Sequence, residues 1–200
     1  MNADISAVSS YLLGLQDRIC AALEATETSN TRFERLVLEG ERGGQSRPRV
    51  LDGGAVIERA AVHFSHTVGA SLPAAATTRR PELSGQGFEA VSVSLIVHPR
   101  NPFAPTVHAN FRCFSSDGVG GPAVWWFGGG FDMTPYYGFE EDAIHWHRNA
   151  RAACAPFSNE LYPRLKADCD SYFYLPHRAE PRGIGGLFYD DMNEGGFDHC

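Results

Sequence analysis

The sequence predicts a mixed α and β protein that forms a single domain over residues 1–200. A segment near the N-terminus repeats apolar residues at helical spacing, and two central segments alternate apolar and polar residues as strands do. The 200 residues are 43% hydrophobic and 20% charged, which is ordinary for a globular protein with a sizeable core.

Net charge and cysteine content narrow the class of protein. A formal net charge of −7 argues against a general nucleic-acid binder, and an anionic ligand would need local arginines. The five cysteines include no CxxC pair and are odd in number, which favours a reducing compartment over a disulfide scaffold. No apolar run of about 18 residues and no N-terminal signal pattern are visible. We therefore expect a cytoplasmic protein without a membrane span.

The first part of the chain predicts a helix, a short strand and a hairpin. Apolar residues three and four positions apart indicate an amphipathic helix over 4–25, and they are Ile5, Val8, Leu12, Leu15, Ile19 and Leu23. Residues 33–39 are expected to form a short strand, and 43–47 a polar, glycine-rich loop. An Asp-Gly-Gly sequence favours a hairpin over 50–65, and prolines indicate a loop over 71–87.

Two strands are predicted over 91–98 and 106–114. Their odd-numbered positions are mostly apolar, and side chains of a strand alternate between the two faces of a sheet. Pairing the strands through the loop 99–105 would gather polar side chains on one surface, namely Ser94, His98, His108, Asn110 and Arg112. Such a face is often merely solvated, but two imidazoles, a guanidinium and an amide together favour a functional site.

A third strand, over 123–127, leads into three consecutive glycines and then Asp132. Glycines let a ligand or another chain approach the backbone closely. The apolar neighbours Trp125, Trp126 and Phe131 indicate a partly desolvated carboxylate at Asp132, able to accept N–H donors or to act as a base. A turn or cap would be the default role of this residue, but its place after the glycines favours function.

The last third of the chain predicts two helices and a strand. One helical face contains Phe139, Ala143, His147, Ala150 and Cys154. His147 therefore points inward, and His145 points elsewhere because it lies about 200° around the helix. A second helix is predicted over 159–174 and a strand over 183–189, with Asp190 and Asp191 expected to be a solvated pair.

Four histidines could lie near the polar sheet face, and they are His98, His108, His147 and His177. An all-imidazole set suits zinc, copper, iron or a similar first-row metal. No HExxH motif or thiolate pair accompanies them, so histidines that act as hydrogen-bonding or acid–base groups without metal are an equal alternative.

The residues by themselves predict an anion-binding enzyme with acid–base histidines. Arg112 can bind a carboxylate through two parallel hydrogen bonds, and Asn110 and Ser94 can add others. A histidine-ligated metallohydrolase is an alternative of another class. It would lose activity on chelation and be indifferent to oxygen.

Several long stretches resemble the oxygen-dependent coproporphyrinogen III oxidase family. They read FEAVSVSLIVHPRNPFAPTVHANFR, VWWFGGGFDMTPYYGFEEDAIHWHR, CDSYFYLPHR and RGIGGLFYDDMN, and RVLDGGAVIERAAVHFSH resembles the family's N-terminal strand motif. The resemblance covers nearly the whole chain. It implies an α+β fold with a large, flat antiparallel sheet and helices packed on both faces, working as a homodimer.

The resemblance also implies the reaction. Molecular oxygen would convert two propionates of coproporphyrinogen III into vinyls, giving protoporphyrinogen IX, CO2 and H2O2 in haem biosynthesis. The implied catalytic residues are His108, as proton donor, Asp132 and Arg112. Asp132 would accept pyrrole N–H groups, and Arg112 would hold a propionate. The implied substrate contacts are Ser94, Asn110, Phe111 and Arg112.

The implied metal positions are His98, His108, His147 and His177, for a divalent cation such as Mn. O2 is the expected co-substrate, and no flavin or nicotinamide is expected. The family continues well beyond Cys200, so the resemblance implies that the fold lacks its C-terminal third. A tetrapyrrole-binding protein without oxidase activity remains a further alternative.

Overall fold

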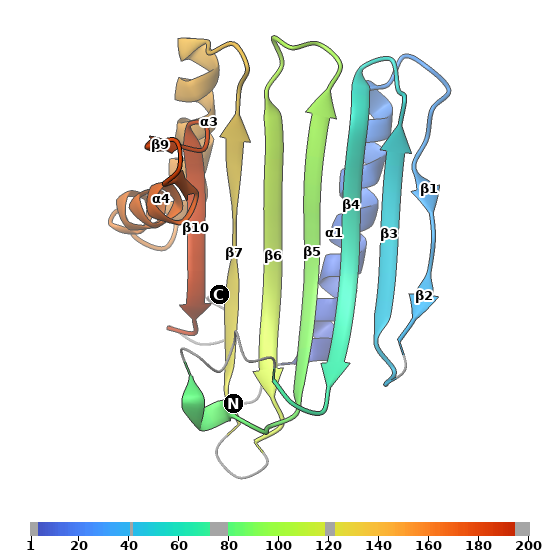
Figure 1. Cartoon of the computed structure of the whole chain (residues 1–200), viewed down its shortest axis with the longest axis vertical. Coiled ribbons are helices and arrows are strands. Elements are labelled where there is room, and N and C mark those ends of the chain that lie inside the picture. Colours follow the sequence, from blue (N-terminus) through green and yellow to red (C-terminus); the bar gives the residue numbers. More distant parts are fainter. Residues whose placement is uncertain (1–3, 41, 73–79, 119–122, 195–200) are drawn as a thin grey trace.

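The chain folds into a large, flat antiparallel sheet with helices packed against it (Figure 1). The computed structural model describes residues 4–40, 42–72, 80–118 and 123–194. Within these ranges the sheet has eight strands, which are β1 (Glu34–Arg35), β2 (Leu38–Glu39), β3 (Gln45–Asp52), β4 (Ile57–Gly69), β5 (Phe88–Pro99), β6 (Thr106–Ser116), β7 (Trp125–Thr134) and β10 (Gly185–Met192). The other elements are the helices α1 (Ile5–Thr26), α3 (Glu140–Cys154) and α4 (Leu161–Tyr172), the 3-10 turn η1 (Pro81–Leu83) and the small hairpin of β8 (Tyr174–Leu175) and β9 (Glu180–Pro181). The expected α+β class with a large antiparallel sheet is confirmed.

Neighbouring strands follow the chain order from β3 to β7, and β10 then adds to the far side of β7. β1 and β2 both pair with β3 at the opposite edge of the sheet. The predicted central strands are confirmed as β5 and β6, and both extend beyond the predicted ranges. The predicted hairpin is formed by β3 and β4, and its turn contains Gly53 at φ +72°, a conformation that favours glycine.

One face of the sheet, here called the helix face, holds the main hydrophobic core. Val8 and Leu12 of α1 cluster there with odd-numbered residues of β5 such as Val93. α3 lies on the same face, because Trp146 meets Phe131 of β7 edge to face with ring centroids 5.1 Å apart. Figure 1 shows α1 and α3 on the same side of the strands.

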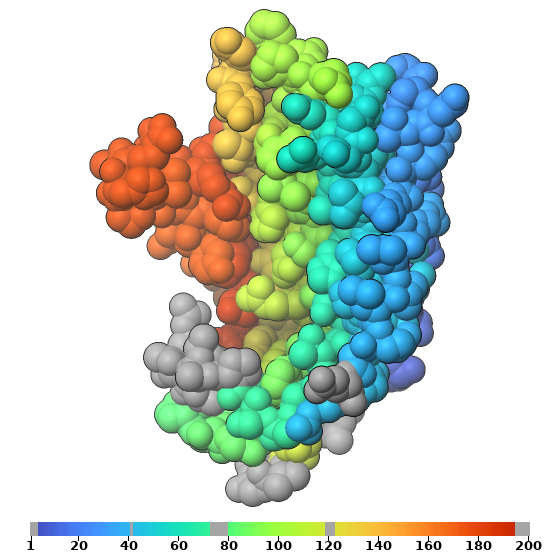
Figure 2. Space-filling view, turned by 45° about the vertical axis from the view of Figure 1, so that its right-hand side comes forward, coloured from blue at the N-terminus to red at the C-terminus, as the bar shows by residue number. Residues whose placement is uncertain are grey.

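The opposite face, here called the open face, carries the even-numbered polar residues of β5 and β6. α4 packs along the edge strand β10, where Leu165 clusters with Leu187 on the helix face. At its end Tyr172 stacks on Phe188 of the open face, with centroids 3.9 Å apart. The described helices therefore do not cover both faces evenly. Figure 2 shows the strands at the surface of the open face, with the segment around the β8–β9 hairpin projecting beside them.

Several predicted boundaries differ from the structure. The strand expected over 33–39 is two short strands, β1 and β2. The loop expected over 43–47 ends earlier, because 45–47 already belong to β3. The glycine run does not follow a strand but lies inside β7, since pairing with β6 and β10 on both sides keeps it extended.

Some predictions concern parts of the chain beyond the sheet. Residues 73–79 of the loop predicted over 71–87, and also Cys200, lie outside the described residues. The four cysteines that the structure describes are free and buried. None of the described helices is long and apolar enough to cross a membrane.

Candidate active site

Three segments bring a histidine, a carboxylate and two arginines to the open face. β6 supplies His108 and Arg112, β7 supplies Asp132, and the turn between β9 and β10 supplies Arg182. His108 and Asp132 are directly opposite each other in the β6–β7 pairing, and side chains of directly opposed residues share a face. Strand register alone therefore brings this pair into contact.

The His108–Asp132 pair has the geometry of an oriented imidazole. Nδ1 of His108 lies 2.8 Å from Oδ1 of Asp132. Because an ionised carboxylate only accepts, Nδ1 is the donor, and the neutral ring then leaves Nε2 as an acceptor. Asp132 is 2% exposed whereas the His108 side chain is 29% exposed. The imidazole is thus the member of the pair that a ligand can reach.

Arg182 completes an ion cluster around Asp132. Its Nε lies 3.0 Å from Oδ2 of Asp132, and its Nη2 lies 2.9 Å from both oxygens. Its guanidinium carbon lies 3.9 Å from the ring centroid of Phe173, and that ring meets His108 edge-on at 6.0 Å. Both oxygens of Asp132 are therefore already engaged. The sequence pattern does not single out Arg182, which simply lies between a proline and a glycine.

Arg112 lies further along β6 and has a carboxylate of its own. Its Nη2 is 2.9 Å from Oδ1 of Asp190 on β10, and its Nη1 donates to Oδ1 of Asn110 at 3.4 Å. The contact with Asp190 is an ion pair by distance but lacks hydrogen-bond geometry. A Cβ at Gly128 would lie 2.6 Å from Asp190 Oδ1 and 2.9 Å from Arg112 Nε, so the glycine makes room for this pair.

The expectation of a solvated aspartate pair holds for Asp191, whose side chain is 40% exposed, but not for Asp190. Asp190 is 28% exposed and pairs with Arg112, and Asp191 pairs with Arg80 at 3.1 Å. Asp190 follows the Tyr189–Gly129 pair and lies beside Gly128, the residue paired with Arg112, whereas Asp191 lies at the irregularity before Met192 and takes a positive φ of 56°. The two carboxylates thereby reach two different arginines.

Two pockets flank His108. The first has a volume of about 300 Å³, and its lining includes His108, Asn110, Arg112, Tyr172, Arg182 and Phe188. The second has a volume of about 290 Å³, and its lining includes Ile96, His98, His108, Asp132, Tyr136 and Arg182. Because the pockets share His108 and Arg182, a ligand that fills both would lie against these two side chains.

The other predicted substrate contacts divide between the two faces. Ser94 and Asn110 are directly opposite each other on β5 and β6, and both face the open side together with Arg112. Phe111 packs against the core of the helix face, because it is the odd-numbered residue between Asn110 and Arg112. Its side chain therefore does not share a surface with its two neighbours.

The four histidines predicted as metal ligands do not converge. His98 and His108 line one pocket, where Nδ1 of His98 lies 3.3 Å from Oγ1 of Thr106. His147 lies on α3, with Nε2 3.0 Å from the carbonyl oxygen of Ile184, and His177 is exposed in the turn of the β8–β9 hairpin. Among the described residues, no three His, Cys, Asp or Glu side chains lie close enough to hold a metal ion. The described donor set therefore does not fit the expected cation.

A buried thiol lies near the ion cluster. Burial, followed by the negative charges of Asp132 and Asp170, raises the pKa of Cys169 to about 11. The thiolate is the reactive form of cysteine. Cys169 is therefore expected to be an inert core residue at neutral pH.

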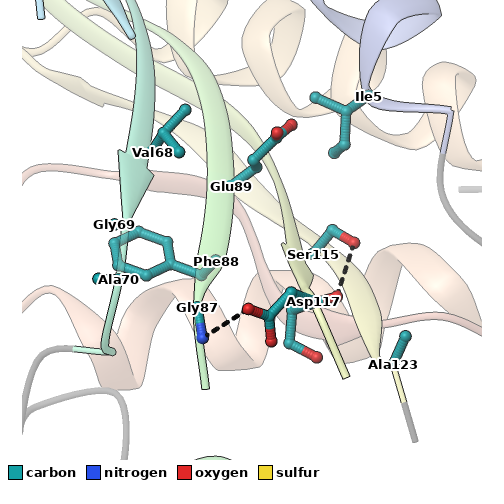
Figure 3. Close-up of a pocket in the computed structure, with 11 residues that line it drawn as sticks. Ile5, Val68, Gly69, Ala70, Gly87, Phe88, Glu89, Ser115, Asp117 and Ala123 are labelled. Carbon is teal, nitrogen blue, oxygen red and sulfur yellow. Dashed lines mark hydrogen bonds between the residues drawn. The ribbon is translucent and has the colours of Figure 1, made fainter. Parts of the chain in front are cut away.

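A third hollow, of about 410 Å³, lies at the other end of β4, β5 and β6 (Figure 3). Its described lining includes Val68, Phe88, Glu89, Ser115 and Asp117, and it shares none of these residues with the two pockets beside His108. Asp117 accepts a hydrogen bond from the backbone N–H of Gly87 at 3.1 Å. No imidazole or guanidinium belongs to its described lining, so the pockets at His108 are the stronger candidates for a site.

Comparison with known protein families adds an independent finding. The family model described as coproporphyrinogen III oxidase matches residues 7–200. The matched range includes β6, β7 and the turn that carries Arg182, and hence the whole ion cluster.

Proposed function

Because the chain belongs to the coproporphyrinogen III oxidase family, we propose that it catalyses the oxygen-dependent oxidative decarboxylation of coproporphyrinogen III to protoporphyrinogen IX. The observation that carries this proposal is the cluster of His108, Asp132 and Arg182 between two pockets, with Arg112 beyond. An acidic protein of net charge −7 needs such local guanidinium groups to hold a tetracarboxylate.

The reaction sets the demands on the site. In each propionate, a C–H bond next to the ring and the bond to the carboxylate break, a vinyl C=C forms and CO2 leaves. The hydrogen from carbon and its two electrons, together with one proton, reduce O2 to H2O2. A site for this reaction must therefore hold the propionate, admit O2 and supply one proton per turn.

His108 is the proposed source of that proton. Its Nδ1 is bonded to Asp132, so a protonated ring can release its other proton from Nε2 while the neutral product keeps a proton on Nδ1. Its exposed ring lines both pockets. A positioned acid–base group of this kind contributes about 10²–10⁴-fold to a rate.

For Asp132 we propose a role other than the expected one. Direct acceptance of pyrrole N–H groups would need free lone pairs, and both of its oxygens are engaged by His108 and Arg182. We therefore assign to it the orientation of His108. A macrocycle lying across the imidazole would reach both pockets and bring a propionate near Arg112, where it would compete with Asp190.

The proposal is tested by incubating the protein with coproporphyrinogen III in air and under argon. The porphyrins are then oxidised, separated and detected by fluorescence. We expect protoporphyrin in air only, and about 10²–10⁴-fold less with His108→Ala. His145→Ala is the matched control, because His145 is exposed on α3 and contacts Arg148 and Asn149 of its own helix. Turnover that is equal in both gases, or binding of the macrocycle without turnover, would contradict the proposal.

A further inference from the structure

The contacts of Arg182 are more specific than those of a typical surface ion pair. Two of its nitrogens lie within 3.0 Å of the Asp132 carboxylate, whose side chain is 2% exposed. Its planar group also lies over Phe173. Planar, forked contact with a carboxylate fixes both position and rotation, which a single point charge does not. The carboxylate is therefore held in one orientation.

That orientation matters because the contacts of Asp132 use all of its acceptor sites. An ionised carboxylate has about four acceptor sites. Arg182 makes three contacts with the two oxygens, and Nδ1 of His108 makes a fourth, with Oδ1. Without Arg182 the carboxylate could rotate away from Nδ1, and His108 would lose the partner that selects its tautomer.

We propose that Arg182 is a positioning residue for the reaction, acting through Asp132 to keep the proton of neutral His108 on Nδ1 and leave Nε2 free. The proposal rests on the proposed function for its kinetic consequence, but the tautomer itself is a property of the free protein. It adds to the site a residue that acts on the imidazole from the far side of the carboxylate.

The local backbone does not depend on the Arg182 side chain. The backbone N–H of Arg182 donates to the carbonyl oxygen of Phe173, and that of Ile184 donates to Met133 of β7. The Arg182 side chain is also 38% exposed. Substitutions at this position should therefore change the ion cluster more than the fold.

The test uses two variants and one control. Arg182→Gln removes the charge, and Arg182→Lys keeps the charge but loses the fork. Arg178→Gln is the matched control, since Arg178 lies in the β8–β9 hairpin just before Arg182, pairs with Glu180 at 2.6 Å and is 62% exposed. Urea unfolding of each protein verifies that the fold is retained.

The first readout is the ¹⁵N NMR signature of the His108 ring in histidine-labelled protein without substrate, assigned with His108→Gln. We expect Nδ1–H with bare Nε2 in the wild type and in Arg178→Gln. Arg182→Gln should shift the ring toward the Nε2–H form, and Arg182→Lys should give an intermediate population. The second readout is turnover, where Arg182→Gln should lower kcat about 10²-fold with KM nearly unchanged.

An unchanged tautomer in Arg182→Gln would overturn the proposal whatever happens to kcat. A raised KM with unchanged kcat would also overturn it, because Arg182 would then be a direct substrate contact. If the wild type makes no protoporphyrinogen, the proposed function fails, whereas the NMR result still decides whether Arg182 sets the tautomer.

Discussion

Replacing Asp132 with asparagine removes the charge that holds His108 and Arg182 together, at nearly constant side-chain volume. Asp132 accepts at both oxygens, whereas asparagine offers one acceptor oxygen and one NH2 donor. In at least one of the present contacts, the NH2 group of asparagine must therefore face an N–H donor of His108 or Arg182.

The expected cost follows from the burial of the cluster. Breaking a buried ion pair by removing one partner typically costs about 3–5 kcal/mol. His108 and Arg182 are 29% and 38% exposed and can recover water, so we expect about 2–3 kcal/mol for Asp132→Asn. For a domain of this size, that corresponds to a loss of about 4–12 °C in Tm.

The assay is urea and thermal unfolding of Asp132→Asn beside Asp52→Asn. Asp52 is a matched control because its Oδ1 lies 2.9 Å from Nε of Arg59 on the same sheet, but the two side chains are 65% and 73% exposed. The control should lose much less stability, because water screens an exposed ion pair. If the two variants unfold at the same urea concentration, the buried cluster contributes no more to stability than an exposed ion pair. The argument for an oriented His108 would then fail.

Three further predictions concern other parts of the molecule. Gly130→Ala should lose about 1–3 kcal/mol of stability in calorimetry, because a Cβ there would lie 2.1 Å from a carbonyl oxygen of β10. Gly138→Ala should lose almost nothing, because a Cβ there would meet open space. Burial opposes ionisation of Glu27, but hydrogen bonds from the backbone N–H groups of 55–57 outweigh it and lower the pKa of this carboxyl. Glu27→Gln should therefore destabilise at pH 7. In urea titrations the difference should begin to shrink near the usual pKa of 4.5 and disappear only below the lowered pKa of the folded state. Asp190→Asn should lower KM by a few-fold at low salt and less at high salt, because it frees Arg112 for a substrate carboxylate.

Local patterns predicted much of the fold. The helix expected over 4–25 is α1, because apolar residues at helical spacing must face one core. The different environments of His145 and His147 follow from the same geometry, since His145 is exposed and His147 reaches the Ile184 carbonyl. The polar face of β5 and β6 follows from alternation alone.

Contacts between distant segments could not be predicted in this way. Arg182 reaches Asp132 across 50 positions, and nothing in its neighbourhood specifies that partner. Asp190 likewise reaches Arg112 only because β10 adds to β7, which brings Asp190 beside Gly128, the residue paired with Arg112. The apolar pattern predicts a strand only over 123–127, before the glycines, whereas pairing with β6 and β10 extends β7 through the glycines and Asp132.

The direct opposition of His108 and Asp132 has a consequence for tolerance to insertion and deletion. A one-residue slip of β7 against β6 would place Phe131 or Met133 opposite His108 and would turn the whole strand inside out. The alternation that buries the core thus also places His108 opposite Asp132. One inserted residue within either strand should therefore disrupt both the core packing and the His108–Asp132 contact. Insertions in the connection between β5 and β6, which lies outside this register, should leave the pair in place.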